Sequence, residues 1–397
     1  MNYILNIDWL TLYCHYSGLD DFAPYSLVVQ EINETFAALK RAIPESSADL
    51  SGAISFRKQA YGTRQFRNLY HVYIGKEKFA EVQMTPHSSI LDPRSVMVKI
   101  ENRRLYTEPK FIDINIFLKA CKFSLQSISR IDLAADFRKF AFIDCGSFIA
   151  HVMDSTYRHV GRGAGAAYFV HGSVKTKAGN QGLLKYNGLS YGANSSACRV
   201  YLYNKTLELL SVKDKPWIRD AWTKAGLISD LYYWQRQDVW RLEVSIKADG
   251  MDVKTPKKES YKISYNDIKT RNFDPQSVNL ETIYFSFIKR KFKFIRNHPG
   301  ITNISREPVL QLFGAERPTP LSPAPRNVTG GNRTERIVLK FLWNMCEEYR
   351  GLDNEDDQGR NLTQELSHDL ASSLAKATDL MPWLQECRKV WETPYHK

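Results

Sequence analysis

Several features are missing from this sequence. No run reaches the roughly 18 uninterrupted apolar residues of a membrane-spanning helix. The six cysteines are scattered, with no Cys-x-x-Cys pair and no histidine at zinc-ligand spacing beside them, and no Gly-x-x-x-x-Gly-Lys-Ser/Thr loop is present. We therefore expect a cytoplasmic protein with reduced thiols, without membrane spans, a zinc finger or a P-loop nucleotide site.

Acidic residues are fewer than basic ones, and the imbalance is uneven along the chain. The 397 residues include 55 Lys and Arg against 43 Asp and Glu, a net charge of +12. Residues 334–397 hold 8 basic and 12 acidic residues, so the preceding part carries +16. A basic body of this kind favours a phosphate-bearing partner such as nucleic acid, bound in a salt-sensitive way.

The sequence predicts three parts. Residues 1–313 form the main domain, and residues 314–333 form a linker rich in proline and then glycine, ending near Gly330-Gly331. Residues 334–397 have helical periodicity and predict a small helical C-terminal domain.

The main domain alternates between strand-like and helix-like patterns. A hairpin is expected to turn at Gly75-Lys76, and the glycine-rich stretch 161–196 is expected to hold another. Further strands are predicted at 3–14, 95–106, 129–137, 198–204 and 238–247, and helices at 26–43, 112–125, 145–158, 207–226 (interrupted near Pro216) and 277–295. The fold class that follows is α+β, with a mostly antiparallel sheet backed by helices.

Three of these strands carry charged or phenolic side chains on one face and apolar ones on the other, because side chains alternate along a strand. The polar positions are Arg130, Asp132 and Asp136; Arg199, Tyr201, Tyr203 and Lys205; and Arg241 and Glu243. If the strands share one sheet, the carboxylates converge, and Mg²⁺ or Mn²⁺ would relieve their repulsion. A tyrosine beside cations or a metal can attack phosphorus, although salt bridges on a solvated face also fit each strand alone.

A basic segment follows in the predicted helix 277–295 and just beyond it. Its charged residues are Lys289, Arg290, Lys291, Lys293 and Arg296. This segment is either a solvated helix face or an element that follows a DNA backbone.

The motif order resembles that of the rolling-circle replication initiators of the Rep_trans type, which plasmids, phages and integrative elements encode. The resemblance spans about Met1 to Phe313 and rests on "VKIENRRLY", "SRIDLAADF", "YGANSSACRVYLYNKTLEL" and "WRLEVSIK". It implies a fold that is a variant of the HUH endonucleases and a site-specific enzyme that nicks and closes DNA at a replication origin. A tyrosine would retain the 5′ phosphate covalently.

The resemblance also implies roles for particular residues. Tyr203 is the expected nucleophile in its Tyr-Asn-Lys block, with Tyr201 as the alternative, Tyr191 as a weaker one, and Lys205 or Arg199 as activating cations. The expected metal ligands are Asp132, Asp136 and Glu243, and Glu208 is expected to assist. Two features depart from the pattern: the histidine pair of the HUH endonucleases is absent, and the linker and tail have no recognisable counterpart.

Two other functions remain open at this stage. A relaxase would use the same chemistry to start conjugative transfer, and a non-catalytic DNA-binding protein would stack bases on Tyr201 and Tyr203. For the nicking enzyme we expect single-stranded or cruciform origin DNA to cross the polar sheet face, held by Arg130, Arg241 and the basic segment. A second copy of the chain and a host helicase are the further expected partners, and no membrane is expected.

Overall fold

The computed structural model describes residues 2–17, 54–87, 92, 94–108, 110–161, 168–175, 183–193, 196–255, 258–269, 278–298, 307–314 and 321–323. The chain divides into two compact units, Met1–Ala324 and Pro325–Lys397, and all described residues belong to the first. The helix expected at 26–43, the helical domain expected at 334–397 and most of the linker expected at 314–333 lie outside the described residues.

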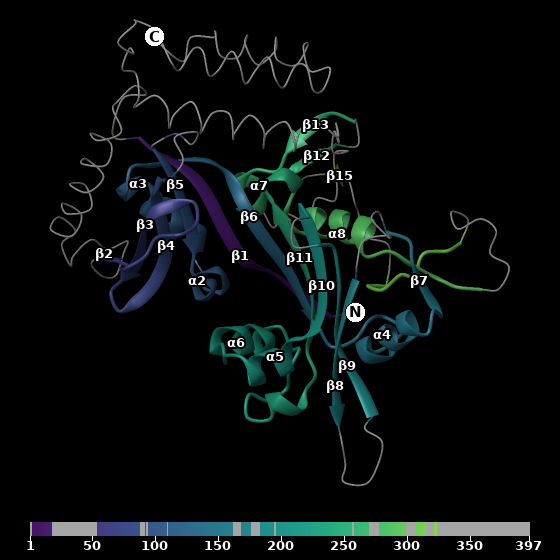
Figure 1. Cartoon of the computed structure of the whole chain (residues 1–397). Helices are drawn as coiled ribbons and strands as arrows, with labels where there is room; N and C mark the ends of the chain where they lie inside the picture. Colours follow the sequence, from purple (N-terminus) through teal and green to yellow (C-terminus); the bar gives the residue numbers. More distant parts are fainter. Residues whose placement is uncertain are drawn as a thin grey trace, which may run out of the picture. The chain divides into compact units, whose positions relative to one another are not determined.

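A ten-stranded antiparallel sheet dominates the first unit (Figure 1). Its strand order is β2-β3-β4-β5-β1-β6-β11-β10-β9-β8. The strands are β1 (Tyr3–Tyr16), β2 (Ile54–Lys58), β3 (Phe66–Ile74), β4 (Glu77–Pro86), β5 (Ser95–Ile100), β6 (Phe123–Phe137), β8 (Tyr168–Lys175), β9 (Leu183–Tyr191), β10 (Cys198–Asn204) and β11 (Trp240–Lys247). The expected antiparallel α+β architecture is thereby confirmed.

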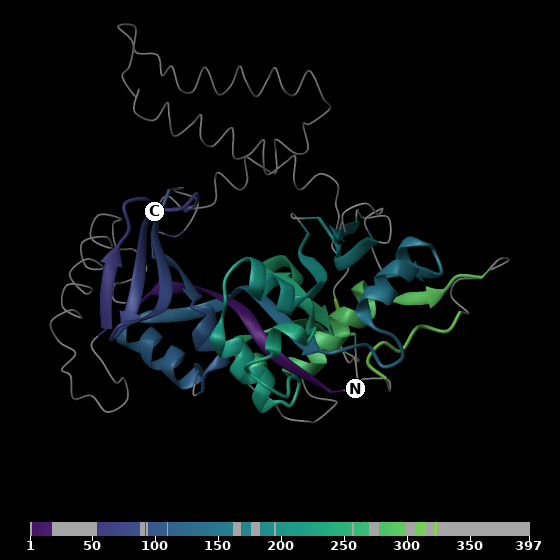
Figure 2. The same ribbon diagram turned by 90° about the horizontal axis from the view of Figure 1, so that it is seen from below.

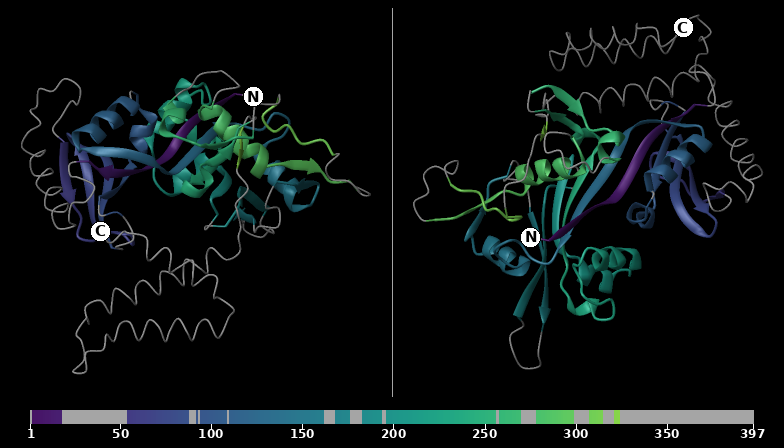
Figure 3. Two further views of the ribbon diagram at one scale, coloured as in Figure 1. Left: turned by 90° about the horizontal axis from the view of Figure 1, so that it is seen from above. Right: turned by 180° about the vertical axis from the view of Figure 1, so that it is seen from behind.

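One face of the sheet is apolar and forms the main core. Leu133, Leu202 and Leu242 are fully buried there, as alternation along β6, β10 and β11 predicts. This core is completed by α3 (Lys110–Ala120), α4 (Cys145–Met153), α7 (Tyr265–Lys269) and α8 (Leu280–Lys291). In the view from behind, α8 crosses the central strands (Figure 3), and its Tyr284 donates a hydrogen bond of 3.0 Å to the Leu242 carbonyl.

The opposite, polar face is partly covered by an insertion between β10 and β11. It consists of α5 (Lys205–Ser211), α6 (Pro216–Lys224) and the 3-10 helix η1 (Trp234–Arg236). In the view from below, α5 and α6 lie in front of the central strands (Figure 2). Their own small core includes Trp222 and Trp234, and Ile4 of β1 packs against it. The helical region interrupted at Pro216 is confirmed, because Pro216 opens α6 where a missing N–H costs nothing.

Some boundaries differ from the sequence prediction. The strand expected at 95–106 ends at Ile100, and Asn102–Tyr106 forms the short helix α2 instead. The helix expected at 112–125 ends at Ala120, because the chain turns at Lys122 with φ +55° and enters β6. The hairpin at Gly75 is confirmed, with φ +60° at that glycine, and the glycine-rich stretch forms the expected hairpin β8-β9.

Smaller pairings close the unit. A three-stranded sheet pairs β12 (Asp252–Lys254) with β13 (Ser260–Lys262) and with β15 (Ser322–Pro323), so part of the expected linker joins the first unit. A two-stranded ribbon pairs β7 (Tyr157–His159) with β14 (Phe294–Arg296). Within the described part, no helix has the length and apolar character needed to cross a membrane.

Candidate active site

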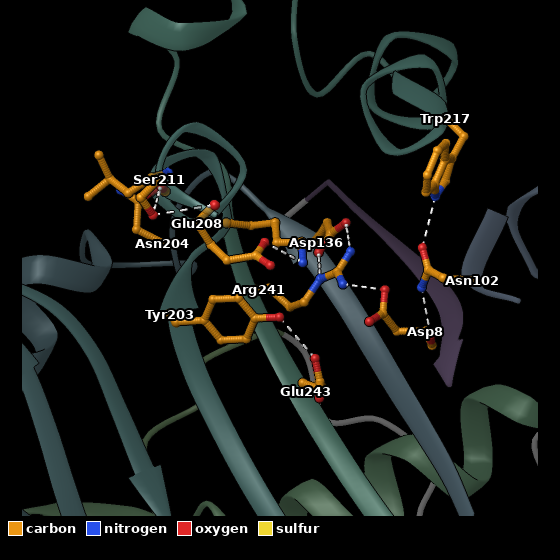
Figure 4. A network of polar contacts seen from close by, with 12 residues as sticks. Asp8, Asn102, Asp136, Tyr203, Asn204, Glu208, Ser211, Trp217, Arg241 and Glu243 are labelled. Atoms are coloured by element: carbon orange, nitrogen blue, oxygen red, sulfur yellow. Dashed lines mark hydrogen bonds and ion pairs between the residues drawn. The ribbon is translucent and has the colours of Figure 1, made fainter. Parts of the chain in front are cut away.

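The fully buried guanidinium of Arg241 organises the polar face of the sheet (Figure 4). Its Nε and Nη2 donate to the two carboxylate oxygens of Asp136, directly across the β6-β11 ladder, at 2.6 and 2.8 Å. Its Nη1 donates to Asp8 at 2.5 Å, and its Nη2 also donates to the Tyr106 hydroxyl at 2.8 Å. The Arg241 guanidinium thus joins three strands, β1, β6 and β11, to the helix α2.

The carboxylate of Asp8 is held ionised beside Arg241. Asp8 lies at an irregularity of the β1-β6 register between Ile7 and Trp9, and its carboxylate accepts from Arg241. Burial alone would raise the pKa of Asp8, but Arg241 and Lys205 outweigh it and hold that pKa well below its usual value. Asp136 also accepts a hydrogen bond of 2.8 Å from the Trp222 indole. Both Asp136 oxygens are therefore occupied.

Tyr203 lies beside this centre with its hydroxyl aimed at a carboxylate (Figure 4). The hydroxyl donates to Glu243 Oε2 at 3.0 Å, and Lys205 Nζ lies 5.4 Å from the centre of the phenol ring. Burial, then the charge of Glu243, raises the pKa of Tyr203 well above its usual value of 10, so the phenol is neutral here. Chemistry at this oxygen requires a proton acceptor, and Glu243 is in hydrogen-bond contact.

Lys205 does not continue the strand, as the sequence prediction had it, but is the first residue of α5. The turn is made by Asn204, whose side chain caps the helix by accepting from the Leu207 N–H at 3.0 Å and donates to Asp238 at 2.9 Å. Lys205 is buried, and its Nζ forms an ion pair with Glu208 Oε2 at 2.6 Å. The Tyr-Asn-Lys block thus places a phenol and an ammonium together at the strand-to-helix corner.

The neighbouring polar residues form cation and aromatic pairs. Tyr201, directly opposite Glu243 in the ladder, is partly buried under the Arg199 guanidinium, 4.5 Å from its ring centre. Arg130 forms a bidentate pair with Asp132, at 3.0 and 2.6 Å, and also covers the Trp9 ring. These predicted residues share the face of Tyr203.

The donor chemistry of this face, rich in carboxylates, suits a hard divalent cation. Around Arg241 and Lys205 lie four carboxylates, those of Asp8, Asp136, Glu208 and Glu243. Burial, then Asp8 and Asp132, raises the pKa of Glu243 to about 7, a repulsion that a cation would relieve. Asp136 fits poorly as a ligand because its two oxygens accept from Arg241 and Trp222, which are both fully buried. The described residues contain no group of three or more His, Cys, Asp or Glu side chains already placed to hold an ion.

Glu243 should leave a signature in the pH dependence of stability. Its folded pKa of about 7 exceeds its usual 4.5, so the folded state binds the proton more tightly and loses stability as the pH rises between these values. We expect Glu243→Gln to remove up to about 3 kcal/mol of this loss between pH 5 and 8. Urea unfolding at pH 5 and at pH 8 measures the change in the free energy of unfolding between these pH values. If Glu243→Gln shows the same change as wild type, the assignment to Glu243 is contradicted.

Two predicted groups lie elsewhere. Tyr191 is buried in the main core, stacked on His159 with ring centres 4.0 Å apart, and does not share the face of Tyr203. The basic segment belongs to α8 and β14 on the apolar side of the sheet, and Lys293 and Arg296 lie beyond the helix end. The expectation that this segment holds DNA on the polar face is not supported by its position.

Sequence analysis missed three contributors to the site: Asp8, Tyr106 and Trp222. Asp8 carried a usable signal, since it is the only Asp, Glu, Lys or Arg in the strand Tyr3–Tyr16. Tyr106 was assigned to a strand rather than to α2, and Trp222 gave no signal beyond helical periodicity.

Comparisons with known proteins give a distant likeness. No family model matches the chain, and no curated protein sequence matches it. Among solved structures, a rolling-circle replication initiator protein from Geobacillus stearothermophilus matches with a TM-score of 0.43 and 12% sequence identity. The match covers 78% of this chain and 94% of that one. At this distance the function must be inferred from the site itself.

Proposed function

We propose that the chain is a site-specific DNA-nicking and closing enzyme of the rolling-circle initiator kind, with Tyr203 as its nucleophile. The observation that carries the proposal is the Tyr203 hydroxyl hydrogen-bonded to Glu243, beside Lys205 and the Arg241 centre. A phenol, an acceptor for its proton and a nearby ammonium are the groups that attack on a phosphodiester requires. Salt bridges alone would explain the pairs around Arg241 but not this Tyr203–Glu243 contact.

The reaction follows from these contacts. Tyr203 passes its proton to Glu243 while its oxygen forms a bond to phosphorus. The bond from phosphorus to the 3′ oxygen breaks, and the 3′ oxygen takes up a proton from water as the free 3′ hydroxyl, while Glu243 releases the tyrosine's proton to water. The 5′ phosphate then remains on Tyr203, and attack by a 3′ hydroxyl reverses the step and closes the strand. Lys205 stabilises negative charge at the reacting atoms, whereas Arg241 holds Asp8 and Asp136 in place.

Glu243, Asp132 and Asp8 are the residues we propose to hold Mg²⁺ or Mn²⁺. A bound divalent cation would polarise the scissile phosphate and offset the charge that develops on its oxygens. Asp136 is left out because its partners Arg241 and Trp222 are fully buried, whereas Arg130, the partner of Asp132, is partly exposed and can be displaced by a cation. Binding of the cation can be measured separately from nicking, since a cation held by the folded state raises the midpoint of thermal unfolding. Asp132→Asn should reduce that rise.

Covalent capture tests the proposal directly. The protein is incubated with single-stranded oligonucleotides from its candidate origin, with Mn²⁺ or with EDTA, and separated on a denaturing gel. We expect a cation-dependent adduct that peptide mapping places on Tyr203. An adduct on Tyr201 would move the nucleophile by two residues, and tight binding without adduct or nick under any metal would replace the enzyme with a DNA-binding protein.

The same assay separates two substrate forms. Because Tyr203 and Glu243 are both partly buried, a phosphate must leave duplex geometry to reach them. We therefore expect single-stranded or cruciform DNA to be nicked and relaxed linear duplex to be spared. The gel cannot separate replication from conjugative transfer, which differ in the DNA site and not in this chemistry.

A further inference from the structure

The insertion between β10 and β11 exposes large apolar side chains in an unusual concentration. Of the nine such side chains among the described residues, five lie within residues 210–233. Tyr232 is 90% exposed and Tyr233 is 57% exposed, and they are adjacent in sequence. Exposed neighbouring aromatic rings are costly in water and mark surfaces that bind a partner.

These two tyrosines are held outward by a braced segment. Trp234, the next residue, is buried in the small core of the insertion. The Tyr232 N–H is bonded to the Asp230 carboxylate at 2.6 Å, and η1 begins at Trp234. The Gln237 side chain accepts hydrogen bonds from the Ser229 N–H and from Arg138. The backbone that carries the two rings is therefore braced before any partner arrives, which lowers the entropy lost on binding.

The chemistry around the tyrosines favours a nucleic acid base over an apolar protein surface. The Arg236 guanidinium lies 5.1 Å from the centre of the Tyr233 ring, and Arg236 is itself exposed. Apart from Leu231, the exposed residues next to the tyrosines in sequence, Ser229, Gln235 and Arg236, are polar. A flat aromatic face beside a cation that can reach a phosphate is how proteins bind single strands.

The segment is also tied to the nucleophile. It leads directly into Asp238, which is bonded to the Asn204 side chain at 2.9 Å, next to Tyr203. We propose that Tyr232 and Tyr233 form a stacking platform for unpaired bases of the DNA strand that Tyr203 cleaves. This inference rests on the proposed function for its substrate, but its test measures binding and not cleavage.

The test compares single-strand affinity with EDTA present, so that no cleavage occurs. Fluorescence anisotropy of a labelled oligothymidylate is measured for wild type, for Tyr232→Ala/Tyr233→Ala and for Tyr232→Phe/Tyr233→Phe. We expect at least a roughly tenfold loss of affinity in the alanine variant and near wild-type affinity in the phenylalanine variant, because stacking needs only the ring. Tyr61→Ala is the matched control, since Tyr61 is 85% exposed on another part of the chain.

Unchanged affinity in the alanine variant would overturn the platform, as would an equal loss in Tyr61→Ala. A shift of the alanine variant from dimer to monomer on a sizing column, with DNA affinity intact, would also overturn it and assign the tyrosines to a contact between copies of the chain. The results distinguish failure of the stacking proposal from failure of the proposed nucleophile. Loss of affinity without any covalent adduct in wild type keeps the platform, whereas an adduct with unchanged affinity keeps only the enzyme.

Discussion

Replacing Tyr203 by phenylalanine is expected to abolish the covalent DNA adduct and to lower nicking by at least about 10³-fold. The substitution removes the oxygen that bonds to phosphorus, and no other group can donate it at the same position. The fold should survive, because the lost hydrogen bond to Glu243 is worth only about 1 kcal/mol. Gel quantification of nicked strand measures the first effect, and thermal unfolding measures the second.

Tyr201→Phe is the matched control for that variant. Tyr201 lies two residues away on the same strand and face, under Arg199 instead of beside Lys205. The Tyr201→Phe variant should keep the DNA adduct on Tyr203 and most of the nicking rate. If Tyr201→Phe loses the adduct and Tyr203→Phe keeps it, Tyr201 is the nucleophile, and the Glu243 contact of Tyr203 serves only to position the strand.

Arg241→Met should cause the largest loss of stability, about 3–5 kcal/mol at pH 7. The methionine fills similar volume but leaves the carboxylates of Asp8 and Asp136 without their cation in a buried site. Urea unfolding measures the loss. The exposed Arg67 of β3 provides the control, and Arg67→Met should change stability by no more than about 0.5 kcal/mol.

A second substitution shows that the unpaired charge is the cause. Asp136→Asn combined with Arg241→Met should be more stable than Arg241→Met alone, since one uncompensated carboxylate is gone. The ion pair of Asp8 with Arg241 also makes the stability of the wild-type protein depend on pH. Because the folded pKa of Asp8 lies below its usual 3.8, its stabilisation is complete above that value and is lost as the pH falls below it. Equal losses in the single and double variants would contradict this account.

The strands that carry the site were predictable because they are buried on one face only. In β6, β10 and β11 the alternation of Leu with Asp, Tyr or Glu fixes which side chains share a surface. Tyr203 and Glu243 could therefore be placed together once the strands were assumed to pair. The neighbour order of strands distant in sequence is not encoded in any one of them, so the bidentate pair of Arg241 with Asp136 could not be foreseen.

The unpredicted parts depend on tertiary contacts. Helix α8 has the pattern of an amphipathic helix, but residues Thr282 to Ile288 are all buried, because other elements pack around it. Local periodicity cannot say how many sides of a helix are covered. Asp8 meets Arg241 because β1, β6 and β11 lie side by side in the sheet, an order that none of these strands alone reveals.

The distance along the chain between Asp8 and Arg241, 233 residues, has a consequence for the order in which the protein matures. During synthesis, β1 leaves the ribosome first, gains β6 as a neighbour much later, and waits for β11 before the central strands are complete. Tyr203 emerges before Glu243, the residue that would accept its proton, and before Arg241, which would hold Asp8 and Asp136. A nascent chain that stops between β10 and β11 would therefore carry the tyrosine without the means to use it.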